Sequence, residues 1–256
     1  MAVLSSIGLR KEFAGHSPND PSVLALKNLN FTVNHNEFCS VLGHSGCGKT
    51  TLLTMVAGFE QPTAGQLLLD GKPIGKPGWE RSMIFQDYAL FHWLTVEENI
   101  AFGLEMKNMR REERKSVVKD YIGLVGLAGF ERRYPHQLSG GMRQRVSIAR
   151  ALAVDPQVLL MDEPFAALDA QNRSLMQQEM VRIWERARKT CVLVTHSIDE
   201  AIALSDRILV MTRRPGTIKA DMLVDLPRPR HEDDPKVIAL KKQIRELIVD
   251  EFEVEH

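Results

Sequence analysis

The most informative stretch of this sequence is Gly43-His44-Ser45-Gly46-Cys47-Gly48-Lys49-Thr50. It fits the pattern G-x-x-x-x-G-K-[ST], with an apolar run at residues 38–42 directly before it and an apolar segment at 52–59 after it. A strand, a glycine-rich turn and a helix in this order are the setting in which the pattern forms a phosphate-binding loop, or P-loop. The sequence therefore predicts a P-loop at residues 43–50.

The residue types of this loop match the chemistry of a nucleoside triphosphate. Glycines let the backbone curl so that successive N–H groups point at phosphate oxygens, and the following helix adds the positive end of its dipole. Lys49 supplies a cation for the β- and γ-phosphates, the Thr50 hydroxyl suits Mg²⁺, and Thr51 can donate to the α-phosphate. His44 and Cys47 occupy variable positions and are expected to line the loop. The predicted nucleotide-binding residues here are Gly43, His44, Ser45, Gly46, Cys47, Gly48, Lys49, Thr50 and Thr51.

Composition indicates a globular chain and weighs against some partners. The 256 residues are 44% hydrophobic, enough to bury the core of one domain with a small appendage. Because 33 Lys+Arg balance 33 Asp+Glu, we expect no nucleic-acid partner. Cys39, Cys47 and Cys191 form no CxxC pair, which fits a reducing cytoplasm without disulfides or structural zinc. With no signal peptide and no run of roughly 18 apolar residues, the chain is expected neither to cross a membrane nor to be exported.

Short apolar runs alternate with helix-like segments along the chain. Besides residues 38–42, the runs at 158–161, 191–195 and 207–211 are typical of buried strands. Continuous apolar strands separated by segments of 3.6-residue period indicate parallel strands covered by helices. The predicted fold class is therefore α/β.

The same patterns predict two further helices and two connections. A helix is expected at 170–188, with one face made of Met176, Met180, Ile183, Trp184 and Ala187. Residues 14–22 are rich in turn formers and indicate an exposed connection, and the two prolines in 226–230 cannot continue a helix. A last helix is then expected over 234–252, packed back onto the domain through Val237, Leu240, Ile244, Leu247 and Ile248.

A second motif ends the predicted strand 158–161 in two carboxylates, Asp162 and Glu163. Ligands of open α/β sheets bind at the carboxyl ends of the strands, so Asp162 is placed to hold Mg²⁺ directly or through water. Glu163 is then placed to polarise a water aimed at the γ-phosphate. Alone, the motif is equally consistent with a solvated strand end, and the P-loop favours the functional interpretation.

A third motif, Leu138-Ser139-Gly140-Gly141-Met142-Arg143-Gln144-Arg145, resembles the signature of the ATP-binding-cassette (ABC) ATPases. That signature usually reads LSGGQ, and Met142 replaces the glutamine, which affects a side-chain contact and leaves the glycine backbone intact. Ser139, Gly140 and Gly141 before an Arg-rich segment also form a second helix N-terminus suited to an anion. The resemblance runs from about residue 9 to residue 229.

The resemblance implies roles for residues outside these motifs. Gln86 is similar to the glutamine of the Q-loop, Asp169 to the aspartate of the D-loop, and His196 to the switch histidine. Phe13 falls where the family places an aromatic ring that stacks on adenine, although a core phenylalanine is the alternative. The implied catalytic residues are Glu163, His196 and Gln86, the metal ligands are Thr50, Gln86 and Asp162, and the nucleotide contacts beyond the P-loop are Phe13, Ser139, Gly140, Gly141 and Asp169.

The resemblance also implies an architecture and an assembly. The fold would be the P-loop NTPase fold of the ABC type, a RecA-like core with a helical subdomain and an antiparallel β subdomain. The nucleotide-binding domain would span residues 1–230, with the helical signature subdomain at about 88–155, and 231–256 would form the helical appendage. ATP with Mg²⁺ would lie between the P-loop of one subunit and the signature of another, in a head-to-tail homodimer.

ABC-type ATPases serve DNA repair, chromosome packing and translation as well as transport. Residues 86–138 contain no sustained heptad, unlike repair and packing members, and the chain has one P-loop, whereas translation members have two. A transport subunit is therefore favoured, and a soluble ATP-switched binding module without a membrane partner stays open.

Large apolar residues follow Gln86, namely Tyr88, Ala89, Leu90, Phe91, Trp93 and Leu94. They form either core or a groove for a short amphipathic helix of a membrane subunit. Together with Arg214-Pro215-Gly216 and residues 226–230, the stretch 85–95 resembles the nitrate/sulfonate/taurine importers. This implies an ATP-hydrolysing subunit, peripheral on the cytoplasmic side of the bacterial inner membrane, that energises import of a small anion. Its partners would be two copies of an integral membrane permease and, indirectly, an extracytoplasmic solute-binding protein.

Overall fold

The computed structural model describes residues 2–15 and 20–249 and divides into two compact units. The first unit combines Met1–Gly78 with Thr190–His256, and the second is Trp79–Lys189. Residues 16–19 of the predicted connection and 250–256 of the predicted appendage lie outside the described residues. The helical subdomain expected at about 88–155 falls within the second unit, and the domain boundaries at 230 and 231 stay a prediction.

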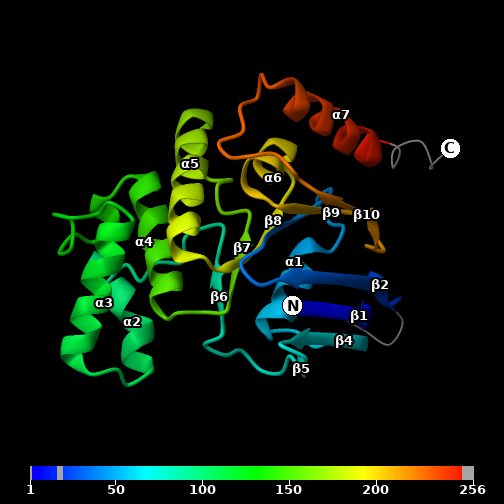
Figure 1. Ribbon diagram of the computed structural model, residues 1–256. Helices are drawn as coiled ribbons and strands as arrows, with labels where there is room; N and C mark the ends of the chain where they lie inside the picture. The colour runs from blue at the N-terminus through cyan, green and yellow to red at the C-terminus, as the bar shows by residue number, and fades with distance from the viewer. Residues whose placement is uncertain (1, 16–19, 250–256) are drawn as a thin grey trace. The chain divides into compact units, whose positions relative to one another are not determined.

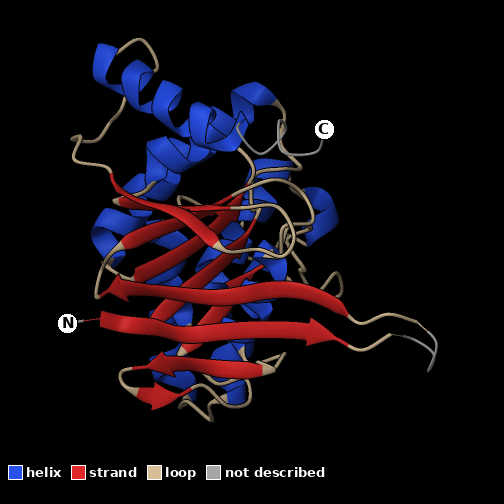
Figure 2. Ribbon diagram, turned by 90° about the vertical axis from the view of Figure 1, so that its right-hand side faces the viewer, coloured by secondary structure: helices blue, strands red, loops and turns tan. Residues whose placement is uncertain are grey.

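An antiparallel sheet fills one side of the first unit (Figure 2). Its strand order is β2-β1-β4-β5, so β1 pairs with both β2 and β4. The strands are β1 (Ala2–Phe13), β2 (Val23–Asn34), β4 (Ala64–Leu69) and β5 (Lys72–Pro73). Alternation along β2 turns Leu29, Phe31 and Val33 into the core while their neighbours face solvent.

Parallel strands form the other sheet of the first unit, in the order β10-β9-β3-β8. Strand β3 runs parallel to both β8 and β9, and β10 is antiparallel to β9 at the edge. The strands are β3 (Phe38–Leu42), β8 (Thr190–Thr195), β9 (Arg207–Met211) and β10 (Ile218–Leu223), and the helices packed on them are α1 (Lys49–Ala57) and α6 (Ile198–Leu204). Every residue of β3 and β8 is buried, as their continuous apolar sequence predicts.

The second unit contains two parallel strands and a group of helices (Figure 1). Its elements are β6 (Arg81–Ile84), α2 (Val96–Met106), α3 (Arg111–Leu124), α4 (Gly140–Ala153), β7 (Val158–Asp162) and α5 (Ala170–Ala187). Helix α4 packs against both α2 and α3. The predicted helix at 170–188 is confirmed, and its predicted face is buried at Met176, Met180, Ile183 and Trp184.

The C-terminal helix α7 (Pro235–Val249) packs on the first unit, as its apolar stripe predicts. Val237 and Ile244 are buried in one cluster with Ala201 and Ile202 of α6. The Lys219 ammonium donates to the carbonyl oxygen of Leu247 at 2.8 Å, which satisfies an acceptor in the last turn of the helix. Within 2–15 and 20–249, no helix has the length and hydrophobicity needed to span a membrane.

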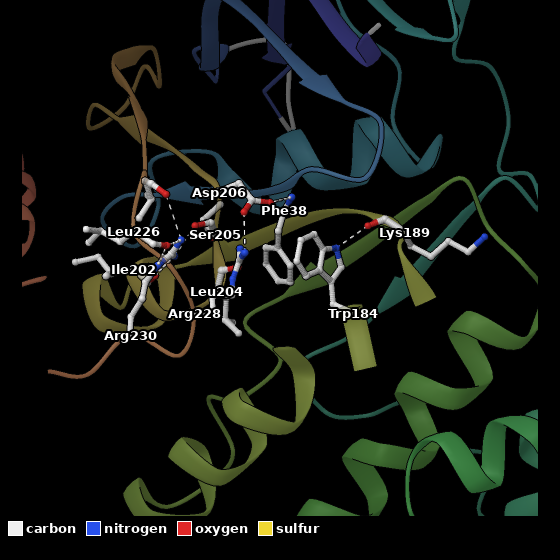
Figure 3. Close-up of polar contacts among 12 residues, drawn as sticks. Phe38, Trp184, Lys189, Ile202, Leu204, Ser205, Asp206, Leu226, Arg228 and Arg230 are labelled. Atoms are coloured by element: carbon white, nitrogen blue, oxygen red, sulfur yellow. Dashed lines mark hydrogen bonds and ion pairs between the residues drawn. The ribbon is translucent and has the colours of Figure 1, made fainter. Parts of the chain in front are cut away.

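Two arginines of the proline-rich segment 226–230 fasten it to the end of α6 (Figure 3). Arg228 donates to the carbonyl oxygen of Leu204 at 2.6 Å and pairs with the Asp206 carboxylate at 2.8 Å. The Arg230 guanidinium donates to backbone carbonyls of Ile202, Ser205, Val224 and Leu226. Burial lowers the pKa of Arg230 to about 10, so its side chain remains a cation at neutral pH.

Replacing Arg230 with methionine should destabilise the fold, because it leaves several backbone carbonyls of α6 and its neighbours without a donor. We expect the free energy of unfolding to fall by about 2 kcal/mol. The measurement is urea denaturation of the two proteins side by side. Arg245→Met, on the exposed face of α7, is the control and should change stability by less than about 0.5 kcal/mol. Equal stability of the Arg230 variant and the wild type would contradict this assignment.

Candidate nucleotide-binding site

The P-loop is a tight turn between β3 and α1, and two of its three glycines adopt left-handed backbone conformations. Gly46 has φ 81°, and Gly48, directly before α1, has φ 102°. A Cβ atom at Gly48 would lie 2.6 Å from the Leu26 side chain, so both conformation and space require glycine there. Ser45, Gly46 and Thr50 are exposed along the turn, which leaves one side of it open to a ligand.

The Lys49 side chain runs back beneath the loop and is buried. Its ammonium donates to the carbonyl oxygens of Gly43 and His44, both at 2.8 Å. These bonds turn two carbonyls of the loop toward the cation. His44 is half-buried, with Nε2 3.5 Å from the carbonyl oxygen of Ile248, and Thr51 is half-buried in the first turn of α1.

A second segment supports the P-loop from behind. The backbone of Gly216 bonds to β2, donating to Ala25 and accepting from Lys27, both at 2.9 Å. A Cβ atom at Gly216 would lie 2.2 Å from the carbonyl oxygen of Cys47, so the two backbones are in direct contact. Burial raises the pKa of the Cys47 thiol, which makes it a packing residue of the loop at neutral pH.

His196 lies beside the P-loop at the same sheet edge. Strands β3 and β8 are parallel with Leu42 opposite Thr195, so the residues that follow each strand emerge together. The His196 side chain is exposed, and Ser197 after it caps α6 by accepting the N–H of Glu200 at 3.3 Å. The first unit therefore brings together a phosphate loop and an exposed imidazole.

Phe13 ends β1 and is 37% exposed, so it is not a core residue. The Lys11 ammonium lies over the ring, 4.8 Å from its centroid. An exposed aromatic ring at the end of a strand is a surface on which a purine can stack.

The second unit repeats the arrangement of paired strand ends. Strands β6 and β7 are parallel with Ile84 opposite Met161, so Gln86 just beyond β6 lies at the same edge as Asp162, the last residue of β7, and Glu163 after it. Gln86 is exposed, and both carboxylate residues are half-buried. Glu163 has φ 44°, a left-handed conformation that costs a non-glycine residue roughly 1 kcal/mol and recurs at functional sites.

Two of the helix N-termini in the second unit, those of α4 and α5, are capped by predicted site residues. Ser139 precedes α4, and its hydroxyl accepts the N–H of Met142 at 3.3 Å. A Cβ atom at Gly140 would lie 3.4 Å from the Leu168 side chain, so the start of α4 packs next to Leu168. Asp169 caps α5, and hydrogen bonds from Asn172 hold the pKa of its carboxyl below the usual value.

The predicted metal ligands come from both units, with Thr50 in the first and Gln86 and Asp162 in the second. A hydroxyl, an amide and a carboxylate supply the hard oxygens that Mg²⁺ prefers, so the donor set fits this ion. Among the described residues, no group of three or more His, Cys, Asp and Glu gathers as a metal site of protein ligands alone. Such a donor set suits an ion that arrives with phosphate oxygens.

Sequence reasoning missed the residues that support the site. Leu26 and Gly216 pack against the P-loop backbone, and Lys11 lies under Phe13. Of these supporting residues, only Gly216 had a signal in the sequence, namely the stretch Arg214-Pro215-Gly216. Close packing of backbone on backbone leaves no periodicity in the sequence.

Comparison with known proteins places this chain in a family, and the matched region contains the P-loop, the Ser139 turn and the Asp162-Glu163 pair. The family described as "ABC transporter" matches residues 26–166. An uncharacterised ABC transporter ATP-binding protein of Methanocaldococcus jannaschii is 52% identical over 91% of this chain and 87% of its own length. A nitrate import ATP-binding protein of Synechocystis is 42% identical over 87% of this chain and 84% of its own. A bicarbonate transport ATP-binding protein of Synechococcus elongatus is 47% identical over 86% of this chain but only 34% of its own length.

The solved structures that resemble this chain indicate the same family as these relatives. A dimeric ATP-binding cassette in a post-hydrolysis state, bound to ADP and Pi, superposes with a TM-score of 0.74 at 30% identity, covering 88% of this chain and 100% of that one. The predicted fold class is confirmed by this match and by the mixed and antiparallel sheets. By sequence and by fold, this chain belongs to the ABC transporter family and is one of its ATP-binding ATPase subunits.

Proposed function

We propose that this subunit hydrolyses ATP to energise the import of a small inorganic anion through a separate membrane permease. The observation that carries the proposal is the P-loop, where a buried Lys49 ammonium underlies an exposed left-handed glycine turn. The anion is inferred from relatives that are named for nitrate import and bicarbonate transport. Both solutes are small planar oxyanions, and their recognition belongs to other chains of the transporter.

In the proposed reaction, the P-loop N–H groups and Lys49 hold the phosphates, and Thr50, Gln86 and Asp162 are the residues that would hold Mg²⁺. When bound, the ion would neutralise charge on the phosphate oxygens. Glu163 accepts a proton from water as the water oxygen bonds to the γ-phosphorus. The bond to the β–γ bridging oxygen breaks, and its electron pair leaves with ADP. His196 holds the γ-phosphate and the attacking water, and Gln86 senses the γ-phosphate.

We propose that two copies assemble head to tail, with each ATP between the P-loop of one subunit and the Ser139 turn of its partner. The capped N-terminus of α4 supports this role, because its N–H groups and dipole attract an anion. ATP that bridges two copies binds fully only in the closed dimer, so its binding energy drives closure. Hydrolysis removes the bridge and reopens the pair.

The membrane contact is proposed at the surface formed by Phe85, Phe91 and Trp93. Trp93 is 72% exposed, and its ring centroid lies 5.5 Å from that of Phe91, while Tyr88 and Leu90 are buried. The segment therefore combines both alternatives, a core part and an exposed aromatic part. Exposed aromatic anchors on a rigid support suit an amphipathic helix of a permease. Such docking would place the subunit at the cytoplasmic side of the bacterial inner membrane.

A soluble ATP-switched module without a membrane partner is the competing function. Reconstitution with the permease and solute-loaded binding proteins separates the two. ATP hydrolysis that rises only with the correct solute-loaded protein supports the transporter, and hydrolysis indifferent to the permease supports the module.

Glu163→Gln should lower kcat for ATP hydrolysis by roughly 10²–10⁴-fold, because the amide cannot accept the water proton. ATP affinity should be retained, and an ATP-dependent dimer should appear in gel filtration. Turnover close to that of the wild type would remove Glu163 from the role of base.

Lys49→Ala should weaken ATP binding by roughly 10–100-fold, because it deletes a charged donor to phosphate. Isothermal titration measures the affinity. Lys72→Ala, at an exposed position of the same unit, is the control and should bind ATP normally. An unchanged affinity of the Lys49 variant would contradict the phosphate-clamp role.

Trp93→Ala should abolish co-purification with the permease and solute-stimulated transport, because it removes the exposed aromatic anchor. ATP binding by the isolated subunit should not change. Trp79→Ala removes a second exposed tryptophan of the same unit, 48% exposed, and serves as the control. Normal transport by the Trp93 variant would exclude this surface as the docking site.

A further inference from the structure

The Lys11 side chain connects three parts of the first unit. Its ammonium lies 4.8 Å from the centroid of the Phe13 ring, 2.8 Å from the Glu60 carboxylate and 2.9 Å from the carbonyl oxygen of Gln61. The side chain is only 12% exposed, although lysine normally extends into water. Lys11 is therefore a half-buried cation held against an aromatic ring.

These contacts use the ammonium group fully. A lysine has three N–H donors, and two of them are directed to the Glu60 and Gln61 oxygens. The remaining side of the ammonium faces the negative face of the Phe13 ring, which is a favourable cation–π arrangement. The Lys11 side chain is 12% exposed, whereas Phe13 as a whole residue is 37% exposed, so part of Phe13 remains accessible beside the ammonium.

Two routes tie this ammonium to the P-loop. Across the antiparallel pair, Lys11 lies opposite Leu26, and the Leu26 side chain packs against Gly48 of the loop. Along the chain, Glu60 and Gln61 follow closely on α1, the helix that begins at Lys49. The position of the Phe13 ring is thus set relative to the phosphate loop through Lys11.

We propose that Lys11 is a positioning residue for nucleotide binding, which holds the Phe13 ring so that its open face receives the purine base. The inference rests on the proposed function, because it assumes that the P-loop binds ATP. The fixed cation on one face of the ring orients it before the ligand arrives and draws electron density from it, which favours a π-rich base on the other face.

A purely structural Lys11 would behave differently. If Lys11 only joined β1 to the segment after α1, its loss would shift the whole binding site. The affinity for the base and the affinity for the phosphates would then fall together. A positioning residue for Phe13 affects only the part of the affinity that the base supplies. Comparing ATP with inorganic tripolyphosphate separates the two, since tripolyphosphate carries the phosphates without the base.

The experiment measures the dissociation constants of ATP and tripolyphosphate by isothermal titration for the full chain and its variants. We expect Lys11→Met to bind ATP about three- to tenfold more weakly and tripolyphosphate as the wild type does. Lys11→Arg should recover the ATP affinity, because a guanidinium can also pair with Glu60 and lie on the ring. Lys72→Met, exposed on β5, is the matched control and should change neither constant.

A second background tests the dependence on the ring. In Phe13→Leu, where no ring remains, adding Lys11→Met should cause no further loss of ATP affinity. Equal losses for ATP and tripolyphosphate, a full effect in the Phe13→Leu background, or unchanged ATP binding by Lys11→Met would each overturn the inference. A wild-type chain that binds neither ligand would instead overturn the proposed function. Unaltered tripolyphosphate binding also verifies that the Lys11 variant is folded.

Discussion

The P-loop depends on one interaction, the ammonium of Lys49 held between the carbonyl oxygens of Gly43 and His44. A lysine this deeply buried is costly unless its donors are used, and the loop supplies acceptors within its own backbone. The same loop requires glycine at Gly46 and Gly48, whose backbones are left-handed, and its exposed residues Ser45, Gly46 and Thr50 leave one side of the turn open. The requirement extends outward, because Leu26 and Gly216 fit against the loop only where side chains are missing.

The two units place their chemistry by the same rule. In each, a pair of parallel strands ends at a common edge, and a motif follows each strand end. Leu42 opposite Thr195 brings the P-loop and His196 to one edge of the first unit, and Ile84 opposite Met161 brings Gln86 and Glu163 to one edge of the second. Parallel pairing therefore explains how residues more than 150 positions apart in the first unit become neighbours.

The sequence predicted the elements whose residues repeat with a simple period. The apolar runs of β3 and β9 are strands at the predicted residues, and the stripe of α7 packs where it was expected. Local motifs were equally predictable from the sequence, because Ser139 and Asp169 cap helices by accepting backbone N–H groups only three residues away. What could not be predicted depends on contacts between distant backbones and single side chains. Neither the fit of Gly216 against Cys47 nor the Lys11 ammonium under Phe13 leaves a pattern along the chain.

The segment after Gln86 has a strained backbone that hydrogen bonds hold in place. Tyr88 and Ala89 have φ of 65° and 46°, conformations unfavourable for both, and Arg150 of α4 donates to their two carbonyl oxygens at 3.1 and 2.6 Å. Asn99 bonds to the backbone of Phe91 in both directions, at 3.0 and 3.1 Å. Backbone held this way persists in strained conformations because its surroundings over-determine it. The surface around Trp93 is therefore fixed to one end of α4, and the other end of that helix begins at the Ser139 turn. Arg150 and the Ser139 turn thus belong to one continuous hydrogen-bonded helix, which connects the strained segment after Gln86 to the N-terminus of α4.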